Sequence, residues 1–403
     1  MKPLGPIPAG FEANAQGRLL IGGTVADMLA KEGTPVFVYD HARIAAQIEQ
    51  FRTAFPGIAL HYAAKANPYG PLLEAIAKLV DGFDVASAGE LDRVSRFSLP
   101  ISFAGPGKSW TDVEGAIRAG IVLNLESEGE ALKALTWGKR LGIVPKLAIR
   151  VNPPFGLKGS GMKMGGLATQ FGVDHDRVHA LVHGVIAGGA EWHGLHIYAG
   201  SQALDAEAVI ELQRATIELA ALIAAQVGRA PPHVNLGGGF GIPYFAKDRP
   251  LDVERVGSAL IKVLEDRPKI LADTKFAIEL GRWLVGEAGV YLTRVVDRKV
   301  SRGETFLVTD GGLHHMLAAS GNFGQLLRRN YPLANASRFA EETCEQFTLT
   351  GCLCTPLDLL GDEVMLPSTN VGDVIAIFCA GAYGLSASPV GFLSQPEARE
   401  ILI

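Results

Sequence analysis

The chain has 403 residues, more than one typical hydrophobic core supports, so we expect one large domain and a smaller one. Apolar residues make up 48% of the sequence and charged residues 20%, which is typical of a globular protein with a sizeable core. The formal net charge of −5 and the lack of basic runs argue against nucleic acid or an anionic membrane as a partner.

Both the start of the chain and the cysteines indicate a cytoplasmic protein. Prolines and glycines stand where a signal peptide would have its apolar segment, and no later stretch is long and apolar enough to cross a bilayer. Cys344, Cys352, Cys354 and Cys379 are too few and too clustered for a secreted disulfide framework, and no second ligand pair completes a metal site. We therefore predict reduced thiols and no metal.

The predicted elements begin with short apolar strands at 18–21 and 36–39 and a helix over 42–54. From residue 60 onward, apolar strands, turns and helices alternate regularly. Eight strands are predicted, at 60–64, 83–87, 101–105, 122–126, 147–151, 195–199, 233–237 and 276–280. Helical patterns between them cover 71–80, 111–119, 128–141 and 206–225.

This alternation predicts an α/β fold with a (β/α)8 TIM barrel over residues 35–285. An open, doubly wound parallel sheet is the alternative. After Arg282 the alternation stops and short strands follow, which predicts a β-domain over 286–403. Active sites of such barrels lie at the C-terminal strand ends, and polar and glycine residues collect there in this sequence.

Lys65 follows the first strand of the barrel, just before the turn signal Asn67-Pro68. Beside an apolar strand its ammonium would have little water, so its pKa should fall and the neutral amine become a nucleophile toward carbonyls. This is the chemistry of a Schiff base. The alternative is a lysine that extends to a charged neighbour at the surface.

Two further strand ends carry groups that suit a phosphorylated ligand. Gly237, Gly238 and Gly239 follow the seventh strand and let backbone N–H groups approach an anion, although turns use glycine for other reasons too. Glu279 ends the eighth strand, where it can pair with a protonated ring nitrogen, and Arg282 can bind phosphate. A simple ion pair between Glu279 and Arg282 is the alternative.

A lysine for an aldehyde, a glycine turn for a phosphate and an acid for a ring nitrogen together predict pyridoxal 5'-phosphate. The sequence resembles the fold-type III pyridoxal-phosphate decarboxylases, the group of the ornithine and diaminopimelate decarboxylases. Its likeness is greatest to the pyridoxal-dependent decarboxylases associated with the exosortase A system. The motifs that carry the resemblance include YAAKANP, FDVASAGEL, HIYAGSQ, NLGGGFGIPY, ELGR, CTPLDLLGD and GAYG.

The resemblance implies that the first 34 residues join the β-domain, that Lys65 is the Schiff-base lysine and that Glu279 pairs with the pyridine nitrogen. It implies a homodimer with shared active sites, in which Cys354 and Asp358 reach the partner's site and Cys354 protonates the carbanion. Further implied cofactor-binding residues are Asp84, Glu90, His196, Tyr198, Ser201, Gly237, Gly238, Gly239, Gly281, Arg282 and Tyr383. The implied substrate-binding residues are Asp358, Thr355 and Arg150.

Three departures from the family pattern bear on the cofactor and the substrate. Tyr198 stands near the position of the histidine that stacks on the cofactor ring, with His196 on the same strand face, so we predict stacking by Tyr198 with His196 beside it. Thr355 replaces the usual acidic residue after the cysteine, and Ala318 stands about where diaminopimelate decarboxylases carry an arginine. Diaminopimelate, lysine and ornithine are therefore doubtful substrates.

The resulting hypothesis is decarboxylation of a small amino acid, or of an amino acid attached to an acyl carrier protein. An amino-acid racemase with the same cofactor is one alternative. A pyridoxal-phosphate-binding protein without catalysis is the other.

Overall fold

The computed structural model describes residues 2–157, 162–163, 165–323, 325 and 327–403. The chain forms two compact units. The barrel unit comprises Gln47–Gly241 and Pro250–Gly281, and the β-unit comprises Met1–Ala46, Ile242–Arg249 and Arg282–Ile403. Within the described part of the chain, no helix has the length and apolar character that crossing a membrane requires.

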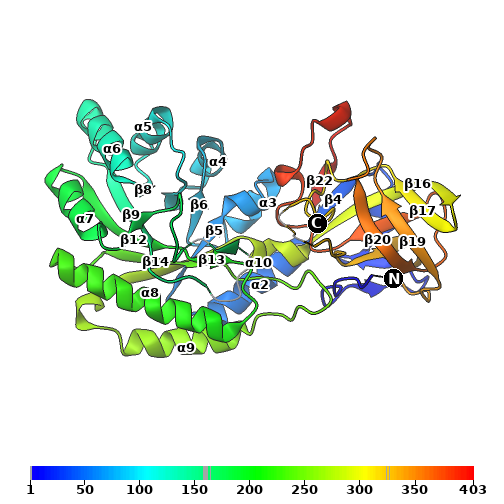
Figure 1. Cartoon of the computed structure of the whole chain (residues 1–403), viewed down its shortest axis with the longest axis horizontal. Coiled ribbons are helices and arrows are strands. Elements are labelled where there is room, and N and C mark those ends of the chain that lie inside the picture. The colour runs from blue at the N-terminus through cyan, green and yellow to red at the C-terminus, as the bar shows by residue number, and fades with distance from the viewer. Residues whose placement is uncertain (1, 158–161, 164, 324, 326) are drawn as a thin grey trace. The chain divides into compact units, whose positions relative to one another are not determined.

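The barrel unit is a closed ring of eight parallel strands (Figure 1). Each of the eight predicted strands is present, and β8 pairs with β9 to close the ring, so the doubly wound alternative was wrong. The strands are β5 (Ala59–Ala63), β6 (Gly82–Val85), β7 (Ile101–Phe103), β8 (Val122–Leu125), β9 (Lys146–Asn152), β12 (Glu191–Ile197), β14 (His233–Gly238) and β15 (Lys275–Leu280).

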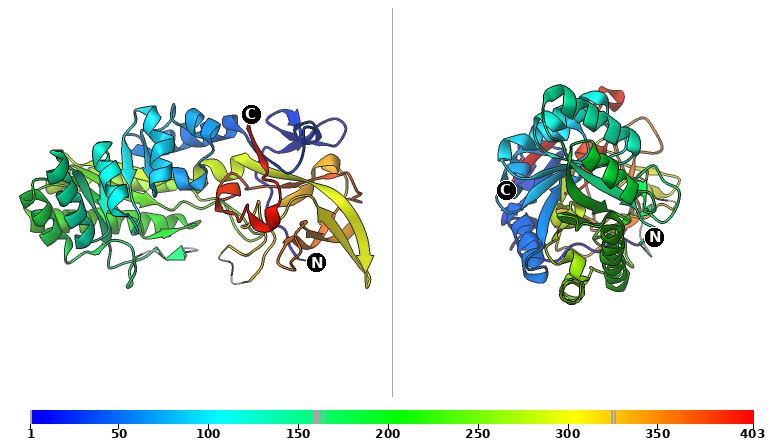
Figure 2. Two further views of the ribbon diagram at one scale, coloured as in Figure 1. Left: turned by 90° about the horizontal axis from the view of Figure 1, so that it is seen from above. Right: turned by 90° about the vertical axis from the view of Figure 1, so that its left-hand side faces the viewer.

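Helices surround this ring, as the right-hand view of Figure 2 shows. They are α3 (Gly70–Ile76), α4 (Ala88–Val94), α5 (Trp110–Arg118), α6 (Glu128–Leu141), α7 (Val178–Ala187), α8 (Ala206–Val227) and α9 (Val253–Glu265). Local signals define their ends. The Ser127 side chain accepts a hydrogen bond from the Glu130 N–H at the start of α6, and Gly142 ends that helix in the left-handed conformation with φ of 67°. The short strands β10 (Met162–Lys163), β11 (Val173–Asp174) and β13 (Gly200–Ser201) lie in loops of the barrel unit.

The β-unit is built mainly from one sheet, ordered β18-β21-β16-β17-β19-β20, with β4 beside β16 and β22 beside β4. Its strands are β4 (Val36–Tyr39), β16 (Gly289–Ser301), β17 (Glu304–Thr309), β18 (Leu333–Asn335), β19 (Glu345–Thr350), β20 (Leu359–Leu366), β21 (Val374–Ile377) and β22 (Arg399–Leu402). A second, three-stranded sheet holds β1 (Glu12–Ala13), β2 (Leu19–Ile21) and β3 (Thr24–Val25). The short helices α1 (Ala26–Leu29) and α10 (Arg282–Val285) also belong to this unit, and α2 (His41–Ala54) begins in it.

The strand at 36–39, which the sequence analysis placed in the barrel domain, belongs to the β-unit. Val36 and Val38 pair with β16 and pack in a core with Val290 and Leu292. Both β-unit and barrel strands are short apolar runs, so hydrophobic pattern alone does not separate them. Pairing between segments some 250 residues apart decides the assignment.

Candidate active site

A cavity of about 430 Å³ lies at the C-terminal ends of the barrel strands. Residues from six different strands or the turns that follow them converge on it, as expected for this architecture. All of them belong to the barrel unit. The polar residues among them include Lys65, Asp84, Arg150, His196, Tyr198 and Glu279.

Lys65 stands on a single 3-10 turn, η1 (Ala64–Ala66), immediately after β5. The turn is fixed by the Tyr62 hydroxyl, which donates to the Asn67 carbonyl at 3.0 Å. The Lys65 side chain is exposed, with Nζ 5.6 Å from the centroid of the Tyr198 ring. The expected apolar, dry surroundings are therefore not found, because the strand ends before the lysine and the turn directs it into the cavity mouth.

Gly281, at the end of β15, permits the close approach of this strand to the Lys65 turn. A Cβ at this position would lie 2.7 Å from the Ala66 Cβ and 3.1 Å from the Ala63 carbonyl oxygen. Any larger residue would push the turn, and with it the lysine, away from the strand. The family motif ELGR thus has a packing reason for its glycine.

Glu279 is buried and bound by two barrel side chains. Asn235 Nδ2 donates to Glu279 Oε2 at 3.0 Å, and His196 Nε2 lies 3.1 Å from the same oxygen. Burial alone would raise the pKa of Glu279, but His196, Lys65 and Arg150 lower it to about 2. The carboxylate therefore stays negative at neutral pH and can pair with a cationic ring nitrogen.

Asp84 is the second buried carboxylate of the cavity. It is 2% exposed, and its Oδ1 has no hydrogen-bond partner. Burial, and next the charge of Glu279, raise the pKa of Asp84 well above its usual value, although Lys65 and Arg150 oppose this effect. An unpartnered buried carboxylate oxygen is costly for folding alone, so it points to a ligand.

The three glycines at the end of β14, Gly237 to Gly239, are required by close backbone contacts. A Cβ on Gly238 would lie 1.8 Å from the Glu279 carbonyl oxygen, and one on Gly239 would lie 2.2 Å from the Gly200 carbonyl oxygen. Gly237 has φ of 71°, and its N–H already donates to Asn235 Oδ1 at 2.8 Å. The turn leaves no room for side chains, as a phosphate-binding turn requires. The Gly237 N–H, however, is already used by its hydrogen bond to Asn235. Ser201, on β13, is buried.

Arg150 and Glu90, two further predicted site residues, both have partners within the barrel unit. Arg150 Nη1 donates to Glu126 Oε1 at 2.8 Å, and its guanidinium lies 4.8 Å from the centroid of the Phe171 ring. Glu90 Oε2 accepts from the Ala86 N–H at 2.7 Å. Burial raises the pKa of Glu90.

Arg282 and Tyr383 belong to the β-unit. Arg282 Nη1 donates to the Tyr244 hydroxyl at 3.2 Å, and its guanidinium lies 4.7 Å from the centroid of the Tyr383 ring. The pKa of Arg282 is raised: the nearby Tyr244 and Tyr383 outweigh burial, which would lower it. Tyr383 has φ of 52°, an unusual conformation for a side chain of this size.

The segment with Cys354 lies in the β-unit and is anchored by Asp358. Cys354 is exposed and Thr355 is half-buried. Asp358 is 2% exposed, and its carboxylate accepts hydrogen bonds from the Leu313 N–H at 2.6 Å and the Leu353 N–H at 2.8 Å. Both oxygens of Asp358 thus bind backbone of its own unit, and its reach into a partner's site stays a prediction.

Three residues that bind predicted site residues were not themselves predicted: Asn235 and Glu126 in the barrel unit, and Tyr244 in the β-unit. Glu126 accepts from Arg150 and, at 2.7 Å each, from the Gly105 and Gly172 N–H groups, so it joins two loops at the cavity. Asn235 and Glu126 each stand on or directly after a predicted apolar strand, and a polar residue at such a place was the available signal.

These features fit pyridoxal phosphate. The orphaned Asp84 oxygen, the side-chain-free turn at 237–239 and the anionic Glu279 are what a cationic heterocycle with a phosphate group needs. Lys65 supplies an amine for the aldehyde.

Comparison with known proteins agrees with this reading. The family described as "Pyridoxal-dependent decarboxylase, pyridoxal binding domain" matches residues 41–286. The chain is 37% identical over 379 residues to an L-glutamyl-[BtrI acyl-carrier protein] decarboxylase of Niallia circulans, covering 92% of this chain and 88% of the relative. It is 31% identical over 399 residues to a diaminopimelate decarboxylase of Archaeoglobus fulgidus, covering 97% of this chain and 93% of the relative.

Solved structures extend the likeness to the whole fold. The crystal structure of an M. jannaschii diaminopimelate decarboxylase with L-lysine matches with a TM-score of 0.88 and 27% identity, over 98% of this chain and 93% of that one. A Vibrio vulnificus lysine/ornithine decarboxylase shares the fold, with a TM-score of 0.78 and 20% identity, over 94% of this chain and 96% of that one. The chain thus belongs to the pyridoxal-dependent decarboxylases of fold type III, enzymes that use pyridoxal phosphate.

Proposed function

We propose that this enzyme decarboxylates an α-amino acid carried on an acyl carrier protein, or a free amino acid of similar size. The observation that carries the proposal is the convergence of Lys65, Asp84 and Glu279 in one cavity at the C-terminal strand ends. A carrier-linked substrate is favoured by the 37% identical relative, whose name states such an activity. It is also favoured by Thr355 and Ala318, which offer no charge to a distal amine or carboxylate.

Each barrel residue has a distinct task in this proposal. Lys65 holds the cofactor aldehyde, the turn at 237–239 with Ser201 holds its phosphate, and Glu279 keeps its ring nitrogen protonated. Pyridoxal phosphate, when bound, accepts the electron pair released as the bond between Cα and the carboxylate breaks and CO2 leaves. His196, Lys65 and Arg150 keep Glu279 ionised for this purpose, and Asn235 binds the carboxylate by a hydrogen bond.

We assign the final proton transfer to Cys354. Its Sγ–H gives a proton to Cα after CO2 has left, and the thiolate then regains a proton from water. The exposed position of Cys354 supports this role. In the proposed homodimer the thiol serves the partner's site.

Visible absorbance and CO2 release test this proposal together. The purified enzyme should show the absorbance of a lysine-bound cofactor, and Lys65→Ala should abolish it, whereas Lys262→Ala on the exposed surface of α9 should not. CO2 should then be trapped during incubation with free L-, D- and meso-amino acids and with aminoacyl carrier proteins.

The outcomes separate the alternatives. CO2 from a carrier-linked amino acid alone would establish that substrate class, and CO2 from free amino acids alone would exclude it. Interconversion of enantiomers without CO2 would support a racemase, and absorbance that persists in Lys65→Ala would contradict the role of the lysine.

A further inference from the structure

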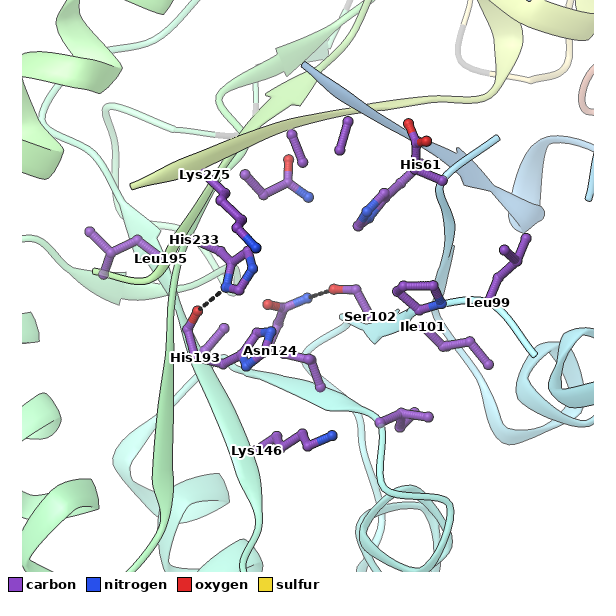
Figure 3. Close-up of a pocket in the computed structure, with 18 of the residues that line it drawn as sticks. His61, Leu99, Ile101, Ser102, Asn124, Lys146, His193, Leu195, His233 and Lys275 are labelled. Carbon is purple, nitrogen blue, oxygen red and sulfur yellow. Dashed lines mark hydrogen bonds between the residues drawn. The ribbon is translucent and has the colours of Figure 1, made fainter. Parts of the chain in front are cut away.

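A second cavity lies at the opposite, N-terminal ends of the barrel strands (Figure 3). Its volume is about 560 Å³, which falls in the range of sites for small molecules. Residues near the start of the strands line it. Lys65, Asp84 and Glu279 are not among them, although Asn235, which donates to Glu279 on the active-site side, is. This end of a barrel ordinarily contributes only stability.

The cavity exists because the barrel interior is filled incompletely. Branched apolar side chains usually pack this space, but Ala59, Ser102, Asn124, Ala148 and Ala277 line it here. Asn124 Nδ2 donates to Ser102 Oγ at 2.5 Å, so polar groups stand where apolar layers are expected. These small and polar side chains leave the space open to a small polar ligand.

Three histidines face this space, as Figure 3 shows. The His193 and His233 rings stack with centroids 4.4 Å apart and planes 11° apart, next to a register shift between β12 and β9. His61 Nδ1 is buried and has no hydrogen-bond partner. Gly82 makes room for this ring, because a Cβ there would lie 3.0 Å from it.

The charges around the cavity favour an anion. Lys146 and Lys275 line it and are exposed. Asp81, the acidic residue of the lining, is already paired with Arg52 at 2.5 Å and accepts from the Leu60 N–H. On the adjoining strand surface, Glu191 lies 3.6 Å from His193.

The histidines can adapt their charge to a ligand. Burial is the largest effect and lowers the pKa of all three. The charges of His233 and Lys146 lower the pKa of His193 further, and that of Lys275 lowers the pKa of His233, whereas Glu191 opposes this on both rings. Glu279 and Asp81 oppose the lowering on His61. An arriving anion would reverse this effect and favour protonation. A metal ion is not the expected occupant, since no described residues form a group of three ligands placed to hold one.

We propose that this cavity binds a small organic anion with a phosphate or carboxylate group, held by Lys146, Lys275 and the histidine cluster. The charge of the lysines attracts the anion, and neutral imidazoles such as His61 can donate or accept hydrogen bonds within it. The inference does not depend on the substrate of the active site.

Titration calorimetry of the cofactor-loaded enzyme at constant ionic strength tests the proposal. Sulfate is the first probe, because its charge stays constant, and citrate is the second. Each should bind saturably and more tightly at about pH 6 than at about pH 8, because the histidines gain protons with the anion. Lys275→Met and Lys146→Met should each weaken binding about fivefold or more.

Lys247→Met, which removes an equal charge from an exposed loop outside the cavity, should leave binding unchanged. Ala277→Leu should block binding by filling the cavity without a change of charge, and unchanged cofactor absorbance will show that each variant is folded. If a variant does not fold, the histidine NMR signals of the unaltered enzyme answer the question: His61, His193 and His233 should shift with sulfate.

Three results would overturn the inference. The first is an absence of saturable binding of both probes. The second is binding that persists unchanged in Lys275→Met and Ala277→Leu. The third is sulfate binding that displaces the cofactor, since the anion would then bind at the phosphate-binding turn.

Discussion

At the scale of single residues, the two buried carboxylates of the active site behave in opposite ways. Glu279 is held ionised by His196, Lys65 and Arg150, whereas Asp84 has an unpartnered oxygen and a raised pKa. A buried carboxylate with an unpartnered oxygen lowers the stability of the folded protein at any pH where the carboxylate must be ionised. The site retains it, so its value must lie in binding or catalysis.

We expect Asp84→Asn to stabilise the cofactor-free protein by about 1–2 kcal/mol at neutral pH and to weaken cofactor binding. The sign follows from linkage. In the unfolded chain the Asp84 carboxyl loses its proton near its ordinary pKa of 3.8, and in the folded chain only at higher pH. The loss of folding stability caused by Asp84 therefore grows as pH rises and disappears as pH falls toward 3.8. Denaturant unfolding at several pH values measures it.

The exposed Asp92 on α4 provides the matched control. Asp92→Asn should change the free energy of unfolding by less than about 0.5 kcal/mol at any pH. A less stable Asp84→Asn variant at neutral pH would show that the carboxylate is satisfied in the folded protein.

At the scale of elements, the contact between the end of β15 and the Lys65 turn should control cofactor retention. Gly281→Ala would place a Cβ 2.7 Å from the Ala66 Cβ, so we expect a loss of about 1–3 kcal/mol in stability and faster cofactor release. Gly184→Ala on α7, where a Cβ meets open space, should instead stabilise the protein by up to about 1 kcal/mol. The decay of visible absorbance during dialysis measures retention, and equal rates for both variants would contradict this account.

The segment that carries Cys354 should depend on the Asp358 anchor in the same way. Asp358→Ala leaves the buried Leu313 and Leu353 N–H groups without acceptors, for a cost of about 2–4 kcal/mol. Asp358→Asn keeps one acceptor oxygen and should lose less. Thermal unfolding of both variants checks the order, and a fully stable alanine variant would refute the anchoring role.

Sequence patterns predicted those parts of the structure that depend on local signals. The eight barrel strands are apolar runs bounded by turns, and Ser127 and Gly142 mark the ends of α6 without reference to the rest of the fold. The strand at 36–39 was assigned to the other unit because its partner β16 stands far away in the sequence. The anchoring role of Asp358 was not predicted, because it depends on a hydrogen bond from the Leu313 N–H, 45 residues away in the sequence, as well as on the nearby Leu353 N–H.

The histidine cavity shows the same limit within the barrel. His61, His193 and His233 lie on three strands, and only the register of the closed ring places their rings together. Each histidine stands on an apolar barrel strand, as a core histidine would. Dispersed sites of this kind emerge from tertiary structure alone.

At the scale of the whole molecule, the proposed shared active site predicts complementation between inactive variants. Lys65→Ala and Cys354→Ala should each be nearly inactive alone. Mixed under conditions that exchange subunits, they should recover up to about a quarter of the native activity, because half of the dimers would have one intact site. Activity against mixing ratio, with size measured by light scattering, tests this. No recovery despite subunit exchange would place Cys354 in the site of its own chain.

The division of the chain into two units also bears on how such enzymes diversify. The amine, the carboxylates and the glycine turn come from one self-contained barrel unit, and the exposed thiol comes from the other unit. Mutations in the β-unit, apart from those at Arg282 and Tyr383, can therefore accumulate without disturbing the groups that bind the coenzyme. One ancestral barrel could in this way be inherited by lineages with different substrates, such as the carrier-linked glutamate and the diaminopimelate named for two of the relatives.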